Sequence, residues 1–298
     1  MVDDRTSNLG QPAHPRIARH DRAPEATDGN DKLTDGLVAH LPLPDDTEDW
    51  HWAMSLNQAN AVAYAIEHFR SLSPRCMGTV VWQLNDCWPV TSWAAVDGYG
   101  RAKPLLYALK HVYADRLVTI QPRDGGSLVV SVVNDGPDAW VDTVEITRFA
   151  FDGTVLATST AALALEPRSS TSIEVPTDVA QATDPAGEVL VATVGGDRAF
   201  WFYIECRDSS IEASNPRVEV ERVSDGYAVT VTADVLVRDL ALLVDKVSPD
   251  AVVDDMLVTL LPGDTHTFHV LLDAEVDASA FVSPRVVRTA NQLVADWR

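Results

Sequence analysis

The sequence has few cysteines and no pattern of metal ligands. Its 298 residues contain three cysteines, which is an odd number and too few for a disulfide framework. If residues 78–84 form a strand, Cys76 and Cys87 lie roughly 20 Å apart, far beyond the reach of a disulfide. No CxxC or HExxH pattern occurs, and the histidines show no ligand-like spacing. We therefore expect reduced, buried thiols, no structural zinc and no cofactor.

Basic residues and long apolar runs are also scarce. There are 23 Lys and Arg against 44 Asp and Glu, a formal net charge of -21, and such a surface repels nucleic acids and anionic membranes. Neutral partners such as sugars fit better. No run approaches the ~18 to 20 apolar residues that cross a bilayer, and MVDDRTSNLG resembles no secretion signal. We expect a cytoplasmic protein.

The composition is that of a folded globular protein. The hydrophobic fraction is 46% and the charged fraction 22%, far from disordered or collagenous extremes. Since domains usually have ~100 to 200 residues, two or three domains are expected.

The first part of the chain predicts a loop followed by a helix. Residues 1–45 carry scattered Pro, Gly, Asp and His without a period. Asp46 or Thr47 can then cap a helix, which ends before Pro74. One apolar stripe along this helix is expected to contain Met54, Ala61, Val62, Ala65, Ile66 and Phe69.

A strand and a second helix follow. Residues 78–84, GTVVWQL, are apolar and β-branched with no polar side chain between Thr79 and Gln83, as is typical of a parallel strand covered on both faces. Residues 103–113 have helical spacing, and Pro104 lies in the first turn, where its missing amide does no harm. Helix, strand, loop and helix indicate a piece of an α/β architecture.

From residue 116 onward the sequence predicts only strands. Alternating runs such as LVVSVVN and GYAVTVTA are divided by turn signals such as NDG and SDG. About 180 residues exceed one sandwich of ~100 residues, so we divide the region at the polar joint RDSSIEASNP. The expected domains are residues 1–115 (α/β), 116–207 (first β-sandwich) and 208–298 (second β-sandwich).

Aromatic and polar side chains gather at the end of the predicted strand. Trp82, Trp88 and Trp93 lie within twelve residues that also contain Asn85 and Asp86. Sugar rings pack their C–H faces on aromatic planes, while their hydroxyls need fixed donors and acceptors. An equally good interpretation from composition alone is that these tryptophans close the top of a core.

The same residues resemble a known family. WQLNDCWPVTSW, followed by DGYGRAKPLLYALK, is similar to the last barrel strand and following helix of β-mannosidases, in glycoside hydrolase family 2 with β-galactosidase and β-glucuronidase. Upstream, DGNDKL and EDWHWAMSLNQANAVAYAIEHFRS occur in the family's order. The resemblance covers roughly residues 14 to 160 and implies the C-terminal end of a (β/α)8 barrel followed by two immunoglobulin-like β-sandwiches.

The resemblance implies a retaining exo-glycosidase acting on terminal β-mannosyl residues through two glutamates ~5 to 5.5 Å apart. One follows an asparagine after the fourth strand, and the other ends the seventh. The sequence contains no Asn-Glu dipeptide, and Glu25 and Glu48, the glutamates before the expected helix, lack the right context. No catalytic residue is therefore assigned, and we expect both glutamates upstream of Met1 and a chain that is inactive alone.

The resemblance also implies site residues. Trp82 matches the family's strand-eight tryptophan and is the expected sugar platform. Asn85 and Asp86 are expected to bond sugar hydroxyls or to hold neighbouring loops, and Trp88 to form a wall of the pocket. Trp93 and Arg101 are interpreted as packing residues.

Three other polar residues are weaker candidates. Glu205 ends the aromatic run FWYIEC, but it lies in the all-β part with no acid partner in view. Glu67 and His68 adjoin the apolar stripe of the first helix and are interpreted as a solvated or supporting pair.

Two classes of function remain open. The first is the C-terminal part of a β-mannosidase, in which the sandwiches buttress the barrel or form a dimer interface and the partner is the missing N-terminal part or a second copy. The second is a non-catalytic sugar-binding or structural module, which predicts exposed aromatics from Trp140, Trp201 and Trp297. The first predicts a large exposed apolar patch within residues 1–115, because one strand cannot close a barrel.

Overall fold

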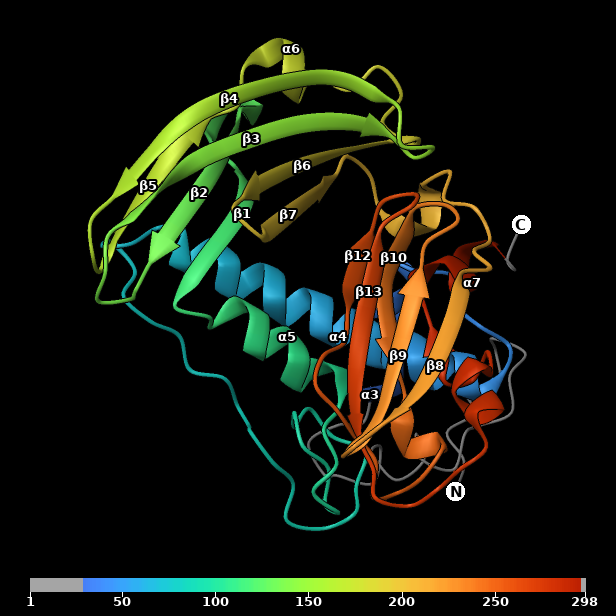
Figure 1. The fold of residues 1–298 in the computed structure, drawn as a ribbon. Helices are drawn as coiled ribbons and strands as arrows, with labels where there is room; N and C mark the ends of the chain where they lie inside the picture. The colour runs from blue at the N-terminus through green and yellow to red at the C-terminus, as the bar shows by residue number, and fades with distance from the viewer. Residues whose placement is uncertain (1–28, 296–298) are drawn as a thin grey trace.

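Strands dominate the protein, and three helices lie against them (Figure 1). The computed structural model describes residues 29–295, so Glu25, Trp297 and most of the predicted N-terminal loop lie outside the described residues. Within that range, no helix has the length and apolarity that a membrane span requires.

The first sandwich is built from two antiparallel sheets. One has the order β1-β2-β5 and the other β4-β3-β6-β7. Its core comes from alternating inward side chains of both sheets, among them Val130, Ile146 and Leu190. The strands are β1 (Arg116–Pro122), β2 (Leu128–Asn134), β3 (Trp140–Ala150), β4 (Val155–Leu165), β5 (Ser169–Glu174), β6 (Glu188–Val194) and β7 (Asp197–Phe202); α6 (Thr177–Ala180) and η1 (Asp124–Gly126) are short turns.

The second sandwich pairs the sheets β11-β13-β9-β8 and β12-β10-β14. The strands are β8 (Arg217–Val223), β9 (Gly226–Thr232), β10 (Val237–Leu242), β11 (Val252–Val253), β12 (Val258–Leu260), β13 (Thr265–Leu271) and β14 (Val287–Arg288), with η2 (Cys206–Asp208), η3 (Val244–Lys246), η4 (Ala278–Val282) and α7 (Ala290–Ala295). The predicted β-sandwich region is thereby confirmed. The division at residues 115 and 207 stays a prediction, and so does the end of a barrel.

Three helices precede this β region: α3 (Gly29–Val38), α4 (Thr47–Arg70) and α5 (Pro104–Val112). The predicted helices are confirmed in α4 and α5. Asp46 caps α4 by accepting bonds from the amides of Glu48 and Asp49, and these bonds lower the pKa of Asp46. The prediction of a loop up to residue 45 is wrong for residues 29–38, which form α3. This helix is stabilised by burial of Leu37 in the second sandwich's core rather than by an apolar period of its own.

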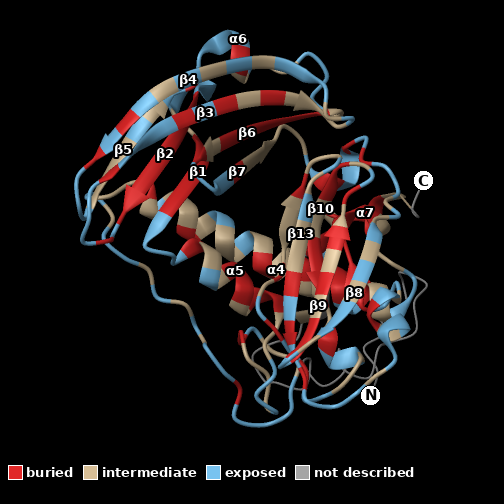
Figure 2. Ribbon diagram, viewed as in Figure 1, coloured by how far each residue is buried: buried red, intermediate tan, exposed pale blue. Residues whose placement is uncertain are grey.

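The predicted apolar stripe of α4 is largely wrong. The buried residues of this helix are Trp50, Trp52, Ala53, Leu56, Ala59 and Ile66. Only Ile66 belongs to the predicted stripe, and Phe69 is exposed. The reason is tertiary: the first half of α4 enters the core of the second sandwich, while its second half meets the first sandwich through polar contacts. Figure 2 shows buried residues along the strands of both sandwiches.

The first half of α4 is fixed to the second sandwich by a buried donor and ion pairs. Trp52 is 1% exposed, and its indole Nε1 donates to the Thr289 carbonyl over 3.1 Å. Asp49 accepts from Arg288 at 2.6 Å. Helices and second sandwich therefore share one core, which also includes Tyr107 of α5.

The second half of α4 is fixed to the first sandwich. Thr119 of β1 donates to the Glu67 carboxylate over 2.9 Å, and His68 Nδ1 lies 3.2 Å from Gln121 Oε1. Arg70 pairs with Asp135 at 2.6 Å. These contacts orient the first sandwich relative to the helices.

The cysteines differ in exposure. All three are free, as predicted, but only Cys206 is buried; Cys87 is exposed and Cys76 is partly buried. The predicted burial is therefore wrong for Cys76 and Cys87, which flank residues 78–84, where no strand is present.

We predict that Trp52→Phe destabilises the protein. The substitution keeps an aromatic ring but leaves the Thr289 carbonyl without its buried donor, so the free energy of unfolding should fall by about 1–3 kcal/mol. Urea denaturation measures this change. The matched control Trp82→Phe alters an exposed ring and should change stability by less than about 0.5 kcal/mol; equal losses in both variants would contradict the role of Trp52.

We also predict a pH-dependent effect of Glu67→Gln. Burial raises the pKa of Glu67 against the opposing hydrogen bond from Thr119. An acid whose pKa is higher in the folded than in the unfolded state stabilises the fold at pH values below its unfolded pKa of about 4.3. This contribution to stability is lost as the pH rises through the pKa of the folded state. Urea denaturation at pH 7 should therefore show Glu67→Gln more stable than the parent, with the gap closing near pH 4. A stability gap between Glu67→Gln and the parent that does not change with pH would contradict the raised pKa of Glu67.

Candidate functional site

The candidate site lies on the arm, which we define as residues 76–103 between α4 and α5. Figure 1 shows the arm as a trace that runs from the end of α4 away from the first sandwich and on toward the second, against whose core Ala102 packs. Its residues 78–84, predicted as a buried parallel strand, are not a strand, and the backbone bends at Trp82 and Leu84. Among the described residues, no backbone hydrogen bond joins residues 77–82 to a neighbouring strand. The prediction is wrong here because the described chain supplies no sheet for this stretch to join.

The stretch nevertheless keeps the two faces of a strand. Thr79, Val81 and Gln83 are partly buried, whereas Val80, Trp82 and Leu84 are exposed. This alternation has the period of two that is typical of a strand. One face is therefore covered and the other is open.

The covered face turns toward α5, and an apolar hollow lies between them. Thr79 Oγ1 lies 2.5 Å from the Tyr113 hydroxyl. Val81 and Leu84, which is itself 59% exposed, line this hollow of about 580 Å³ with Leu106, Leu109, Lys110 and Tyr113. Its lining is almost entirely apolar.

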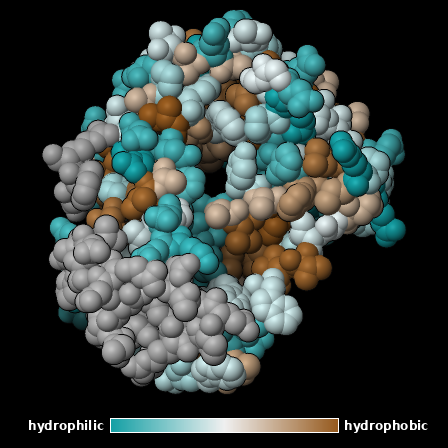
Figure 3. Space-filling model, turned by 180° about the vertical axis from the view of Figure 1, so that it is seen from behind, coloured by the Kyte–Doolittle hydropathy of each residue, from teal (hydrophilic) through white to brown (hydrophobic). Residues whose placement is uncertain are grey.

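The open face confirms the predicted exposed apolar surface. Val80 is 94% exposed and Trp82 75% exposed, values that are unusual for such side chains on a soluble surface. The rear view in Figure 3 shows strongly hydrophobic side chains gathered in one area beside a hollow.

The four predicted substrate-binding residues fall into two kinds. Trp82 and Trp88 are exposed, the second by 64%, and Asn85 is exposed with its amide donating to the Asp86 carbonyl over 3.2 Å. Asp86 is buried, and both of its carboxylate oxygens lie 2.7 Å from the Ser92 hydroxyl. Asp86 was predicted either to bond sugar hydroxyls or to hold neighbouring loops, and its contacts match the second role.

Sequence reasoning missed Ser92 and Lys103, whose contacts complete this loop. Lys103 Nζ donates to the Ser92 carbonyl over 2.9 Å. Burial lowers the pKa of Lys103, while the charge of Asp86 acts in the opposite direction. The only sequence signal was the proximity of both residues to the tryptophans. Arg101, predicted as a packing residue, pairs with Asp97 at 2.6 Å.

The weaker acidic candidates lie elsewhere with partners of their own. Glu205 pairs with His40 at 2.6 Å on the surface, and Glu48 pairs with Lys246 at 2.9 Å. Glu67 accepts from Thr119 at the contact between α4 and β1. In residues 29–295, no group of three or more His, Cys, Asp and Glu side chains could hold a metal ion.

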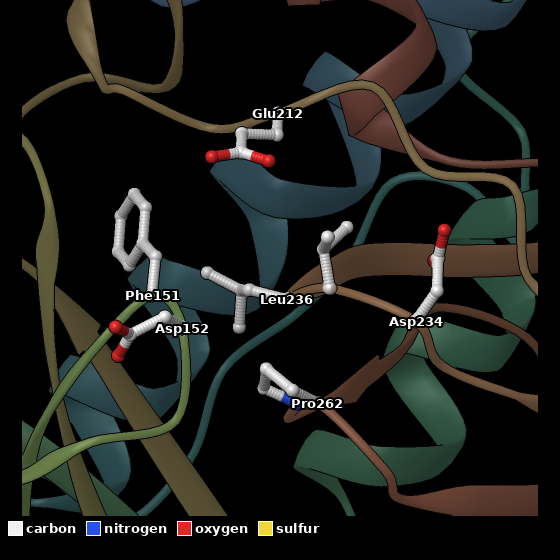
Figure 4. A pocket seen from close by; sticks show the side chains of 7 residues that line it. Phe151, Asp152, Glu212, Asp234, Leu236 and Pro262 are labelled. Atoms are coloured by element: carbon white, nitrogen blue, oxygen red, sulfur yellow. The ribbon is translucent and has the colours of Figure 1, made fainter.

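A second, smaller hollow of about 160 Å³ lies at the junction of the sandwiches, away from the arm, and was not predicted. It is lined by Phe151, Asp152, Glu212, Asp234, Val235, Leu236 and Pro262. Figure 4 shows Asp234 on the opposite side of Leu236 from Phe151 and Asp152. Asp234 accepts from Ser214 and from the Asn215 amide, so its carboxylate secures the chain between the sandwiches.

Comparison with known proteins identifies similar chains. No family profile matches this sequence. β-Mannosidase B of Thermothelomyces thermophilus is 30% identical over 267 residues, which cover 78% of this chain and 31% of the relative. β-Mannosidase A of Aspergillus niger is 29% identical over 139 residues, covering 43% of this chain and 15% of the relative.

Solved structures share the fold. The β-D-mannosidase from Dictyoglomus thermophilum superposes with a TM-score of 0.75 at 21% identity, covering 89% of this chain and 34% of that one. An exo-chitosanase from Amycolatopsis orientalis superposes with a TM-score of 0.58 at 18% identity, covering 86% and 35%.

The chain thus spans about a third or less of the length of the relatives it matches. The motifs of α4 and the arm predicted this relationship before any comparison. The predicted resemblance is confirmed: the chain corresponds to the C-terminal part of a glycoside hydrolase family 2 β-mannosidase.

Proposed function

We propose that this chain is the C-terminal part of a retaining exo-β-mannosidase that removes terminal β-D-mannosyl residues from oligosaccharides. In this proposal, α4, residues 78–84 and α5 are the last helix, strand and helix of a (β/α)8 barrel. The two sandwiches are its immunoglobulin-like accessory domains. The acid/base and nucleophilic glutamates belong to a preceding part of the enzyme, and the complete enzyme is cytoplasmic.

The observation that carries the proposal is the two-faced stretch 78–84, in which the backbone of residues 78–82 is bonded to no neighbouring strand among the described residues. One face turns toward α5, as the outer face of a barrel strand turns toward the helix layer. The other face presents Val80 and Trp82 to solvent, where a barrel has its interior. Unpaired backbone on such an apolar stretch favours strand pairing with another segment.

The sugar contacts proposed for this chain come from the exposed aromatic side chains. Trp82 lies on the open face of residues 78–84, and Trp88 lies six residues further along the arm. Their exposed rings suit the apolar C–H faces of a sugar. The exposed amide of Asn85 can bond a hydroxyl, whereas the carboxylate of Asp86 is engaged by Ser92.

The alternative, a sugar-binding module formed by the sandwiches, finds less support. Trp140 is buried, and Trp201 is partly buried against the first sandwich's core. None of the exposed large hydrophobic residues of the described sandwich strands is aromatic. A flat aromatic platform is therefore not offered there.

The proposal predicts that activity depends on the preceding part of the enzyme. We expect no hydrolysis of an aryl β-mannoside by this chain alone, because its sequence contains no Asn-Glu dipeptide of the kind that carries the family's acid/base glutamate, and turnover when the preceding coding region is joined or co-expressed. Aryl β-galactoside and β-glucuronide serve as specificity controls. Turnover by this chain alone, or preference for either control substrate, refutes the proposal.

The open face predicts association of the isolated chain. We expect binding of a hydrophobic dye and concentration-dependent self-association, both reduced several-fold by Val80→Asp, because a charge interrupts the apolar face. Fluorescence and sedimentation velocity measure these properties. Val141→Asp is the matched control, since Val141 is also highly exposed but lies on β3; a monomeric chain that binds no dye would argue against an incomplete barrel.

A further inference from the structure

The loop that carries Trp88 is held by buried polar contacts rather than by an apolar core. Asp86 is 8% exposed, and Ser92 donates to its carboxylate while accepting from the Ala94 amide over 3.0 Å. One hydroxyl thus connects both sides of the loop. A buried carboxylate is costly unless it is hydrogen-bonded, so Ser92 and Asp86 depend on one another.

Lys103 connects this pair to α5. Its Nζ donates to the Ser92 carbonyl over 2.9 Å, and its backbone amide donates to the Ala95 carbonyl over 2.9 Å. Lys103 directly precedes α5, so it fixes the loop to the helix that covers residues 78–84. The positive charge of Lys103 and the buried negative charge of Asp86 also attract each other.

The base of the loop is joined to the stretch that carries Trp82. The Ala95 amide donates to the Gln83 carbonyl over 3.3 Å, and the Val96 amide donates to the Leu84 carbonyl over 2.8 Å. The Asp86 amide donates in turn to the Val96 carbonyl over 3.0 Å. The backbone on which Trp82 and Trp88 stand is therefore one connected unit.

Gly98 closes the outer side of the loop. A Cβ at this position would lie 2.5 Å from the Trp88 carbonyl carbon and 2.8 Å from the Pro89 nitrogen. The turn that contains Gly98 thus lies directly against the Trp88 backbone. The backbone is confined while the Trp88 ring remains exposed.

We infer that Asp86, Ser92 and Lys103 are positioning residues that hold Trp88 in its sugar-contacting position before substrate arrives. This inference rests on the proposed function. Fixing a loop in its bound conformation reduces the entropy lost on binding, and side chains of a binding site need such supporting contacts. The three residues act through Trp88 and do not contact the sugar.

The first experiment is hydrogen exchange in this chain. Ser92→Ala and Lys103→Met should raise amide exchange of Asp86, Ala95 and Val96 at least tenfold with the Tm unchanged, because these amides make the backbone bonds at the base of the loop and the loop lies outside both sandwich cores. Ser92→Thr retains the hydroxyl and should behave as the parent. Unchanged exchange in both variants overturns the inference. So does exchange in Ser92→Thr that is as fast as in Ser92→Ala.

The second experiment uses the enzyme joined to its preceding part. The same two variants should raise KM for an aryl β-mannoside about tenfold with kcat little changed, since a contact made equally in ground and transition states affects KM. Raised exchange with unchanged KM overturns the inference. An inactive joined parent counts against the proposed function instead, and the exchange result does not depend on it.

Discussion

The contacts that α4 makes at both of its ends hold the described chain together. Its first half lies in the core of the second sandwich, where Trp52 donates to Thr289. Its second half meets the first sandwich through Glu67 and Arg70. Because one rigid helix joins both contacts, the sandwiches and the arm have fixed places relative to one another. Loss of either contact would change the position of everything that α4 carries.

The arm takes its character from this anchoring. It leaves the end of α4 and returns at α5, so both of its ends are secured while residues 78–84 lack a sheet. An apolar side chain left in water forgoes about 1.5–3 kcal/mol relative to burial, and Val80 and Trp82 are both largely exposed. A partner that covers these residues and pairs their backbone would therefore gain considerable free energy. The same exposure makes Trp82 and Trp88 available to a sugar.

Local signals in the sequence predicted much of this arrangement. Asp46 and Pro104 marked the starts of α4 and α5, and strand alternation with turn signals indicated the sandwiches. Tertiary contacts decided the rest. The apolar period of α4 gave the wrong buried face because its covering surface comes from residues about 200 positions later, and α3 depends on the same distant core. The run 78–84 was predicted as a buried strand but is not one among the described residues, because strand pairing requires neighbours. At the site, the tryptophans were predictable, whereas the Ser92–Lys103 contact was not, because no spacing rule encodes it.

Backbone protection of residues 77–82 tests the central claim, that this stretch is a barrel strand without its sheet. Hydrogen exchange would be compared between this chain alone and the enzyme joined to its preceding part. The account predicts fast exchange at these amides in the isolated chain and protection of at least a hundredfold in the joined enzyme. Equal exchange in the two, whether fast or slow, would contradict it.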